Sequence, residues 1–412
     1  MINLIKNIIK DQYYAISLYS RQICGTLVLF IIAHYLSVHD YGLFTSYKNI
    51  AIFCLMFANM EFANYILVSS KAHVKEVQLK ISLFMLNAIF VLFLVIILSM
   101  ICRLESHLLF ILVVIRTFFD GIFFALILPY FQATRKFNTI ANINIFYSLG
   151  IATIAIVAYI LKLSLTKFLI LNIILGLINF IQCSYYVKIN YLLVVNYFKR
   201  FLEKLDRSIL GFIGSTLTDY LYAQTSSLYV AIFLTKEEAA LYFAAFTIAN
   251  IPALISAAQL QKMLPELINA KYIKTKECLI KNLKFIFSIT GAILFFIILF
   301  GKFVLKLFYG QSYYENASLI LIIYFIANML IINGAVFGVH ITANGYQNKK
   351  VQMKLETACI TILSLFILHT FGIYGAIYSL LIASIYVSIR FTVLSLSILN
   401  RQKILYKSEK GV

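Results

Sequence analysis

Charged residues are scarce in this sequence. They make up 12% of its 412 residues, against 62% hydrophobic residues, and the mean hydropathy is +0.92. Water-soluble domains contain about a quarter charged residues. A soluble fold of this size cannot hide so much apolar surface, because part of the chain must always face water. The scarcity excludes a soluble globular protein and indicates an integral membrane protein, whose solvent is lipid.

Motifs built from cysteine, histidine or glycine are also missing. The six cysteines contain no C-x-x-C pair, and the six histidines have no metal-ligand spacing. Neither a disulfide framework nor a zinc site follows from them. No G-x-x-x-x-G-K-[ST] sequence is present, so the chain has no P-loop ATPase of its own. We expect no catalytic residues, no cofactor and no metal.

Acidic residues are outnumbered. The sequence has 35 Lys and Arg residues against 16 Asp and Glu residues, a formal net charge of +19. A basic chain can indicate nucleic-acid binding. Here the basic residues lie in short segments between long apolar runs, which is typical of the cytoplasmic loops of membrane proteins. We therefore expect no nucleic-acid partner.

Long apolar runs are the main feature of the sequence. A membrane-spanning helix needs about 20 apolar residues, and the sequence contains twelve runs of roughly that length. We predict an all-α polytopic membrane protein of about twelve transmembrane helices. The predicted spans are 13–35, 41–68, 81–102, 108–131, 139–161, 164–187, 208–234, 239–261, 284–305, 316–341, 353–370 and 372–398.

The loop charges give the orientation of these spans. The termini and the even-numbered connections carry 25 Lys and Arg residues, and the odd-numbered connections carry six. Basic residues accumulate on the cytoplasmic side, so both termini are predicted to be cytoplasmic. The resulting regions are an interfacial N-terminal helix at 1–12, an N-lobe of six spans at 13–187, a cytoplasmic interlobe linker at 188–207, a C-lobe of six spans at 208–398 and a basic cytoplasmic tail at 399–412.

The two halves resemble each other weakly. Residues 36–44 and 234–242 share the order Leu, hydroxyl, two variable residues, acid, two more residues, Leu, aromatic. Each segment follows the first span of its half. Since each half has an even number of spans, the halves are predicted to be related by a pseudo-two-fold axis along the membrane normal. Gly334 and Gly338 on span ten form G-x-x-x-G, a signal for close helix packing.

Three short motifs are typical of one transporter family. They are L-S-x-x-D-Y-G-L-F at 36–44, F-Q-A at 131–133 and F-Y-G-x-x-Y at 308–313. With the span count, they make the chain similar to the O-antigen flippases, the polysaccharide transporter branch of the multidrug/oligosaccharidyl-lipid/polysaccharide exporter superfamily. The resemblance implies two six-helix lobes around a central cavity that alternates its access. It implies moving an undecaprenyl-pyrophosphate-linked oligosaccharide to the periplasmic leaflet of the bacterial inner membrane.

The same resemblance implies partners and a cavity lining. The partners are membrane lipids, H+ or Na+ as coupling ion, and the polymerase and chain-length regulator of the pathway. The cavity is lined by spans one, two, seven and eight, which carry Arg21 and Lys48 in the first half. A pyrophosphate headgroup needs such cations, since Arg grips phosphate oxygens bidentately and Lys acts as a point charge. The alternative for both is snorkelling to the interface.

Other charged residues within the spans are expected to have partners, because an unpaired charge in lipid costs free energy. Glu61 is expected either to pair with Arg21 or to bind a coupling proton. Arg116 and Asp120 are four residues apart and therefore share a helix face. An intrahelical ion pair that packs the N-lobe is favoured there over transport chemistry. Arg390 is expected to snorkel.

A polar stripe marks span seven. Asp219, Tyr222 and Ser226 lie on one helical face, which must avoid lipid. A hydroxyl-rich face suits sugars, and a polar seam between helices is the alternative. Asp219 is the candidate protonation or cation site. Span eight carries Asn250 beside Pro252, which bends the helix, and Asn250 is a further candidate for substrate contact.

Two other functions remain open at this stage. A membrane-embedded polysaccharide polymerase would be an enzyme of the same pathways, and it should have a long periplasmic loop. The longest periplasmic connection here is 306–315, which argues against an enzyme. A cation-coupled drug antiporter would share the architecture, and an acid-rich cavity would favour it.

Cysteine accessibility tests the predicted topology. Single cysteines introduced at 103–107 or 235–238 should react with a membrane-impermeant thiol reagent from the periplasm. Single cysteines at 262–283 should react only after permeabilisation. Labelling of any one of these loops from the opposite side contradicts the predicted topology.

Overall fold

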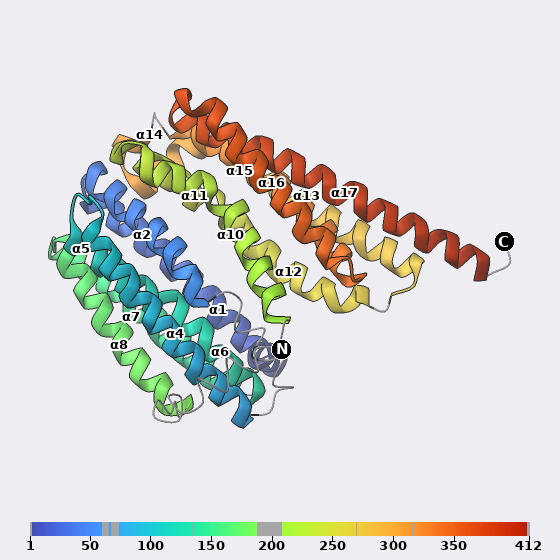
Figure 1. Ribbon diagram of the computed structural model, residues 1–412, viewed down its shortest axis with the longest axis horizontal. Coiled ribbons are helices and arrows are strands. Elements are labelled where there is room, and N and C mark those ends of the chain that lie inside the picture. Colours follow the sequence, from blue (N-terminus) through green and yellow to red (C-terminus); the bar gives the residue numbers. More distant parts are fainter. Residues whose placement is uncertain are drawn as a thin grey trace. The chain divides into compact units, whose positions relative to one another are not determined.

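The structure is a computed structural model that describes residues 2–59, 66, 74–134, 136–187, 208–268, 270–314 and 317–409. All regular structure in these residues is helical, which confirms the predicted all-α class. The chain divides into two compact units, Met1–Leu217 and Thr218–Val412 (Figure 1).

Unit 1 is a bundle of long helices that follows predicted spans one to six. α1 packs along α7, while α2 packs against α4 and α5, and α8 covers α5 and α7. The fourth predicted span consists of α5, a π-helical turn η1 and α6 in succession. The bounds are α1 Ile2–Tyr35, α2 Val38–Asn59, α4 Val74–Ile101, α5 His107–Thr117, η1 Phe118–Ile122, α6 Phe123–Ala133, α7 Phe137–Ile160 and α8 Leu165–Val187.

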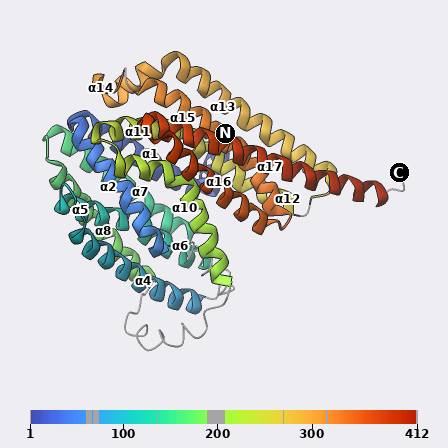
Figure 2. The same ribbon diagram turned by 45° about the horizontal axis from the view of Figure 1, so that its top comes forward.

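Unit 2 is built around α15, which packs against α11, α12, α13 and α17. The long helices α13, α15, α16 and α17 lie side by side in both views (Figures 1 and 2). The bounds are α10 Ser208–Phe233, which crosses the unit boundary, α11 Lys236–Ala249, α12 Ile251–Ile268, α13 Tyr272–Tyr309, α14 Gln311–Tyr314, α15 Ser318–Ala343, α16 Gln347–Leu368, η2 His369–Phe371 and α17 Ile373–Glu409.

The outer faces of these helices are apolar. Side chains such as Ile101 and Phe366 are 77% and 78% exposed, a pattern that water would penalise and lipid accepts. Within the described residues, eight helices are long and apolar enough to cross a bilayer. The predicted spans outside that set are the first, second, seventh and eighth.

Two segments differ from the sequence-based prediction. Residues 2–12 do not form a separate helix, because α1 runs without interruption from Ile2 to Tyr35. The eighth span is divided into α11 and α12 at Asn250, just before Pro252. Proline lacks the N–H that a continuous helix would use there. The predicted linker at 188–207 lies outside the described residues.

The weak repeat between the halves is a pair of helix caps. Asp40 N donates to Ser37 Oγ at 3.0 Å at the start of α2, and Ser37 Oγ donates to Asp40 Oδ2 at 2.7 Å. At the equivalent place before α11, Thr235 and Glu238 form a full capping box. Hydroxyl and acid side chains three residues apart satisfy the free N–H groups of a helix start. The repeated sequence thus corresponds to the N-terminal cap of the second helix in each half.

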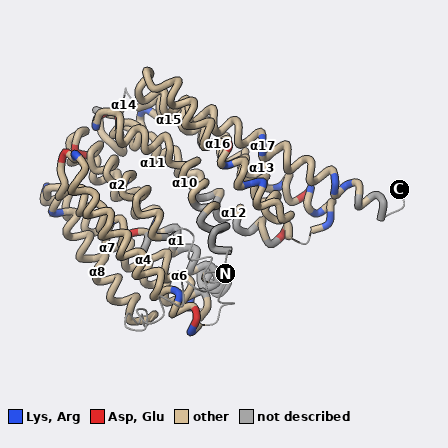
Figure 3. The backbone as a smooth tube through the Cα atoms, in the orientation of Figure 1, with Lys and Arg blue, Asp and Glu red and all other residues tan. Residues whose placement is uncertain are grey.

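Basic residues of unit 2 gather where α13 and α16 begin and α17 ends (Figure 3). The rings of Tyr272 and Tyr406 lie 6.1 Å apart and join the first of these helices to the last. Gln402 Nε2 also donates to Asn344 Oδ1 at 2.8 Å, which ties α17 to the turn before α16. These segments are the connections that the loop charges assign to the cytoplasmic side.

The G-x-x-x-G motif of α15 lies against α17, as the sequence indicates. A Cβ on Gly334 would lie 3.2 Å from the Cα of Ser388, and one on Gly338 would lie 3.2 Å from the ring of Phe391. The two backbones can approach only because both positions lack a side chain. This contact holds the centre of unit 2 together.

Substitution at Gly334 tests this packing. Gly334→Leu should destabilise the protein by about 1–3 kcal/mol, because extra atoms in a tightly packed seam force the helices apart. Gly291→Leu on α13 is the matched control, since a Cβ there meets no atom within 4 Å. Thermal unfolding in detergent should show a lower Tm for Gly334→Leu alone. Equal melting of both variants contradicts the close contact.

Candidate functional site

Four charged side chains of unit 1 form one cluster within its spans. Arg21 comes from α1, Lys48 from α2, Arg116 from α5 and Asp120 from η1. Electrostatic interactions with Asp120 reach Arg21 and Lys48, and an ion pair joins it to Arg116. The elements meet because α2 packs against α5 and against η1. The sequence placed Arg21, Lys48 and the Arg116–Asp120 pair on three different spans, and the fold brings them together.

Asp120 is the centre of the cluster. Its Oδ2 lies 3.2 Å from Nε of Arg116, which confirms the predicted i,i+4 ion pair. Its Oδ1 accepts a hydrogen bond from the hydroxyl of Tyr147 on α7. Its backbone carbonyl accepts one from the guanidinium of Arg21. A single residue therefore joins α1, α5 and α7.

Arg21 is directed into unit 1. Besides the carbonyl of Asp120, its Nη1 donates to Asn144 Oδ1 at 3.4 Å. The guanidinium lies 4.2 Å from the ring centroid of Phe124 and 5.4 Å from that of Tyr147. Cation–π contacts and hydrogen bonds to oxygen both fix its plane. Arg21 therefore does not snorkel to the membrane interface in this structure, which was the alternative to a place in the cavity.

Arg116 is also held by aromatic rings, and it is the more buried of the two partners. Its side chain is 10% exposed, whereas that of Asp120 is 30% exposed. The guanidinium lies 5.5 Å from the ring of Phe44 and 5.2 Å from the ring of Phe168. The ion pair thus has a fixed cationic end inside the bundle and a carboxylate end that can be reached from outside.

Lys48 leaves the cluster with an excess of positive charge. It is partly buried and interacts electrostatically with both Arg116 and Asp120. Among the described residues it has no carboxylate within ion-pair distance. Three cations therefore share one described carboxylate. Such an excess is costly in lipid and is most easily retained where an anion binds.

The π-helical turn η1 has room beside it. A Cβ on Gly121, next to Asp120, or on Gly25, one turn after Arg21, would meet no atom within 4 Å. π-Helical turns insert an extra residue into a helix and occur frequently at functional sites. Here the turn carries the carboxylate on which the cluster is centred, and open space adjoins it.

Unit 2 holds a neutral polar cluster at the break in span eight. Asn328 on α15 donates through Nδ2 to the carbonyl of Ala249 at 2.7 Å and to Asn250 Oδ1 at 3.0 Å. Tyr222 and Ser226 lie on α10, and Ser226 is 2% exposed. Asn250 therefore stabilises the break between α11 and α12, and a role for these three residues toward substrate stays a prediction.

Two predicted residues fall outside what the structure describes. Glu61 lies between the described residues 59 and 66, and Asp219 lies in α10 with its side chain outside the described ones. Their proposed parts in ion pairing and proton binding stay predictions. Within the described part of the chain, no group of His, Cys, Asp and Glu residues could hold a metal ion.

Several hydrogen-bond partners of the charged residues were not predicted from the sequence. Tyr147 and Asn144 complete the cluster of unit 1, and their spacing of three residues on span five is the signal that was available. The side chain of Arg390, which was expected to snorkel, has an acidic partner. Its Nη2 donates to Glu356 Oε2 at 3.0 Å. Tyr386 donates to the same oxygen at 2.7 Å. The separation of 34 positions between Glu356 and Arg390 hides that pair from sequence.

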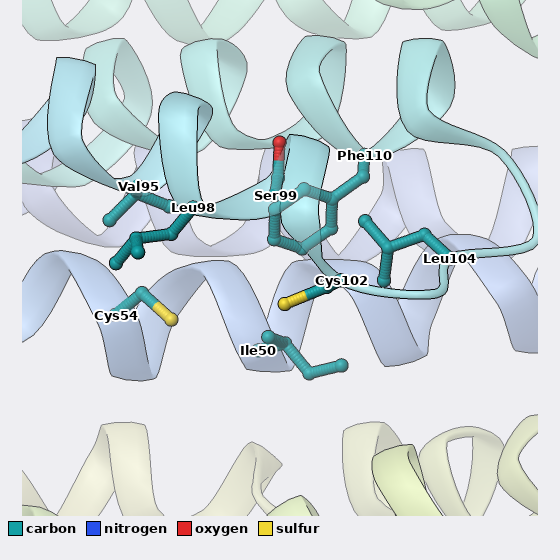
Figure 4. Close-up of a pocket in the computed structure, with 8 residues that line it drawn as sticks. All are labelled: Ile50, Cys54, Val95, Leu98, Ser99, Cys102, Leu104 and Phe110. Atoms are coloured by element: carbon teal, nitrogen blue, oxygen red, sulfur yellow. The ribbon is translucent and has the colours of Figure 1, made fainter.

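A separate apolar cavity lies between α2, α4 and α5. Its volume is about 120 Å3, and its lining has no charged side chain (Figure 4). The hydroxyl of Ser99 donates to the carbonyl of Ile96 at 2.6 Å. The apolar lining does not suit a charged headgroup, and the cation cluster is the candidate site for one. The lining residues are Ile50, Cys54, Val95, Leu98, Ser99, Cys102, Leu104 and Phe110.

No protein-family model matches the chain, and no curated protein matches its sequence. Solved structures do match. A lipid II flippase, MurJ, in an inward closed conformation aligns with a TM-score of 0.68 and 16% identity, over 96% of this chain and 92% of that one. A multidrug resistance MATE family transporter of the MOP superfamily, in an inward-facing conformation, aligns with a TM-score of 0.67 and 13% identity, over 93% and 95%.

A further match is a MATE protein in its bent conformation, with a TM-score of 0.57 and 15% identity over 96% of each chain. At these identities the likeness establishes the fold. The chain has the twelve-helix, two-lobed fold that these proteins share, as the sequence predicts. Because one match is a lipid flippase and two are MATE proteins, the fold alone does not choose a substrate.

Removal of one hydroxyl tests the cluster. Tyr147→Phe should destabilise the protein by about 1.5–3 kcal/mol, the usual worth of a buried hydrogen bond to a charged group. Tyr386→Phe is the matched control, since it removes the same kind of bond, to Glu356 in unit 2, from a tyrosine that is less buried than Tyr147. Melting in detergent should show the larger loss for Tyr147→Phe. The reverse order contradicts a central role for Asp120.

Proposed function

We propose that the protein is a flippase for undecaprenyl-pyrophosphate-linked oligosaccharide, the repeat unit of an O-antigen. It carries the lipid from the cytoplasmic to the periplasmic leaflet of the bacterial inner membrane by alternating access, with both termini in the cytoplasm. Its fold is shared by a lipid II flippase and by multidrug transporters. Transport, and no enzymatic step, is the activity that this fold supports.

The observation that carries the proposal is the excess of cations among the described charges within the spans of unit 1. Arg21 and Lys48 are partly exposed side chains within the spans, and Asp120 is the one described carboxylate that faces them. A phosphate-bearing headgroup must leave water to cross the bilayer, and paired cations replace its hydration. The planar guanidinium of Arg21 matches two phosphate oxygens, while Lys48 supplies a second charge.

The sugar part is expected to meet neutral polar groups. The α10 face with Tyr222 and Ser226, together with Asn250, supplies hydroxyl and amide groups of the kind that bind sugar hydroxyls. These groups are partly or fully buried in unit 2 in the present structure. Their exposure would have to change during the transport cycle, as alternating access requires. The polymerase and chain-length regulator of the pathway are the expected recipients of the product.

A cation-coupled drug antiporter is the alternative that shares the fold. Many of its substrates would be cationic, and a cationic substrate needs acidic side chains in its site. The described cluster of unit 1 has the opposite charge balance. The coupling ion, H+ or Na+, remains assigned to Asp219 and Glu61 as a proposal.

Reconstitution tests the function. The full chain in proteoliposomes should move undecaprenyl-pyrophosphate-linked oligosaccharide between leaflets, measured by access of the sugar to an external lectin. Arg21→Ala should slow this movement about tenfold or more, because loss of a buried contact to a charged group costs about 2–5 kcal/mol. Arg21→Lys should recover part of the rate, since it restores the charge without the planar fork.

Arg390→Ala provides the matched control for that experiment. It removes an arginine that is ion-paired on α17, far along the chain from the cluster, and it should leave the rate near that of the wild type. Equal loss in both variants means that any intramembrane arginine is needed for folding. Export of a cationic dye with no lipid movement supports the antiporter instead.

A further inference from the structure

The apolar cavity between α2, α4 and α5 is separate from the cation cluster and has no role in headgroup binding. Ser99 supplies the one hydroxyl of its described lining, and that hydroxyl donates to the carbonyl of Ile96. A buried water needs several polar partners, so an apolar cavity stays dry and takes apolar ligands. The volume of about 120 Å3 is close to that of engineered cavities that bind benzene,. The cavity therefore suits a compact hydrocarbon group.

The cavity is reached from the outer face of α4. Leu98 and Cys102 belong to its lining and are both exposed. Phe90, Ile97 and Ile101 continue the exposed apolar surface along the same helix, which is the kind of surface that contacts lipid,. A hydrocarbon chain that lies along α4 can therefore place one segment in the cavity without passing through water.

The cavity lies at one end of the spans, on the stretch of α2 that carries Lys48. Cys102 and Leu104 follow the end of α4, on the side that the loop charges predict to be periplasmic,. Ile50 comes two residues after Lys48, and the ring of Phe110 lies 5.3 Å from that of Tyr47. This is the depth at which the hydrocarbon chain of a lipid in the periplasmic leaflet begins.

We propose that the cavity binds an isoprene unit of a polyprenyl chain, the unit close to the headgroup of the transported lipid. The inference rests on the proposed function, which supplies a polyprenyl-linked substrate. In a bilayer the chain is already surrounded by hydrocarbon, so exclusion of water adds little to binding. The gain comes from the void itself, whose lining lacks van der Waals partners until a ligand fills it.

The shape of an isoprene unit favours it over a segment of a saturated acyl chain. Each unit has a methyl branch, which fills width where an unbranched chain fills length. Each unit also has a double bond that does not rotate. Fixing it in the cavity therefore restricts fewer rotatable bonds than fixing an unbranched segment of equal carbon number, and less conformational entropy is lost.

Neutral alcohols test the cavity independently of the cation cluster, because they carry no phosphate. The probes are farnesol, an isoprenoid alcohol, and pentadecanol, an unbranched alcohol of equal carbon number. The full chain in nanodiscs reacts with N-ethylmaleimide, and mass spectrometry follows Cys102 at the mouth of the cavity. Farnesol should slow its modification about tenfold and pentadecanol much less, since filling a cavity of this size supports such an effect. Cys359, exposed on α16, is the internal control and should react at an unchanged rate.

Substitutions in the lining locate the effect. The thiols of Cys54 and Cys102 point toward one another across the cavity (Figure 4). Cys54→Leu should therefore fill the cavity and abolish the protection, which is the ratio of rates without and with farnesol. Cys24→Leu changes a half-buried cysteine of α1 outside the lining and should retain it. If Cys54→Leu fails to fold, Leu98→Ala removes a wall at the exposed mouth and should reduce the protection, whereas Leu94→Ala, one turn earlier, should not.

The outcomes separate this inference from the proposed function. Equal protection by the two alcohols overturns the assignment to an isoprenoid and indicates a site for any hydrocarbon chain. Protection that persists in Cys54→Leu, or in Leu98→Ala where that variant replaces it, overturns the cavity as the site. A wild type that is protected by farnesol but moves no lipid in proteoliposomes refutes the flippase and supports the inference. A wild type that moves the lipid without protection of Cys102 refutes the inference alone.

Discussion

Asp120 links the first, fourth and fifth spans of unit 1, through its carboxylate to Arg116 and Tyr147 and through its backbone carbonyl to Arg21. Lipid offers no hydrogen bonds, so every polar group in a span must find its partners within the protein. Asp120 provides them to Arg116, Tyr147 and Arg21 at once. The aromatic rings around the two guanidinium groups then fix their planes. The remaining positive charge is what makes this region a candidate site for an anionic headgroup.

The same constraint applies in unit 2, where the described ion pair within the spans has no excess of charge. Glu356 is shared by Arg390 and Tyr386, so that ion pair is neutral. At the break near Pro252, Asn328 satisfies a carbonyl that would otherwise lack a partner. Small residues on α15 allow α17 to approach closely. The described ion pair of unit 2 is thus neutral, whereas the described cluster of unit 1 contains three cations and one carboxylate.

The fold and the charged side chains support different parts of the proposed function. The likeness to a lipid II flippase and to multidrug MATE transporters, at 13–16% identity, concerns the path of the chain. Such an architecture is shared by a lipid flippase and by multidrug transporters, because function resides in the side chains placed on it,. Among the described charges within the spans of unit 1, cations outnumber carboxylates, which favours an anionic lipid over a cationic drug. The proposed substrate therefore depends on a few residues and not on the fold.

The sequence alone determined the membrane class, the twelve spans and the Arg116–Asp120 pair, because hydropathy and helical spacing are local properties. It also marked the paired helix starts at Ser37 and Thr235 and the close contact at Gly334. It did not bring Arg21 to Asp120 or Arg390 to Glu356, and it did not show the π-helical turn. Those features arise from contacts between residues 34 or 99 positions apart. Only the packing of the helices against each other decides which distant polar side chains become partners.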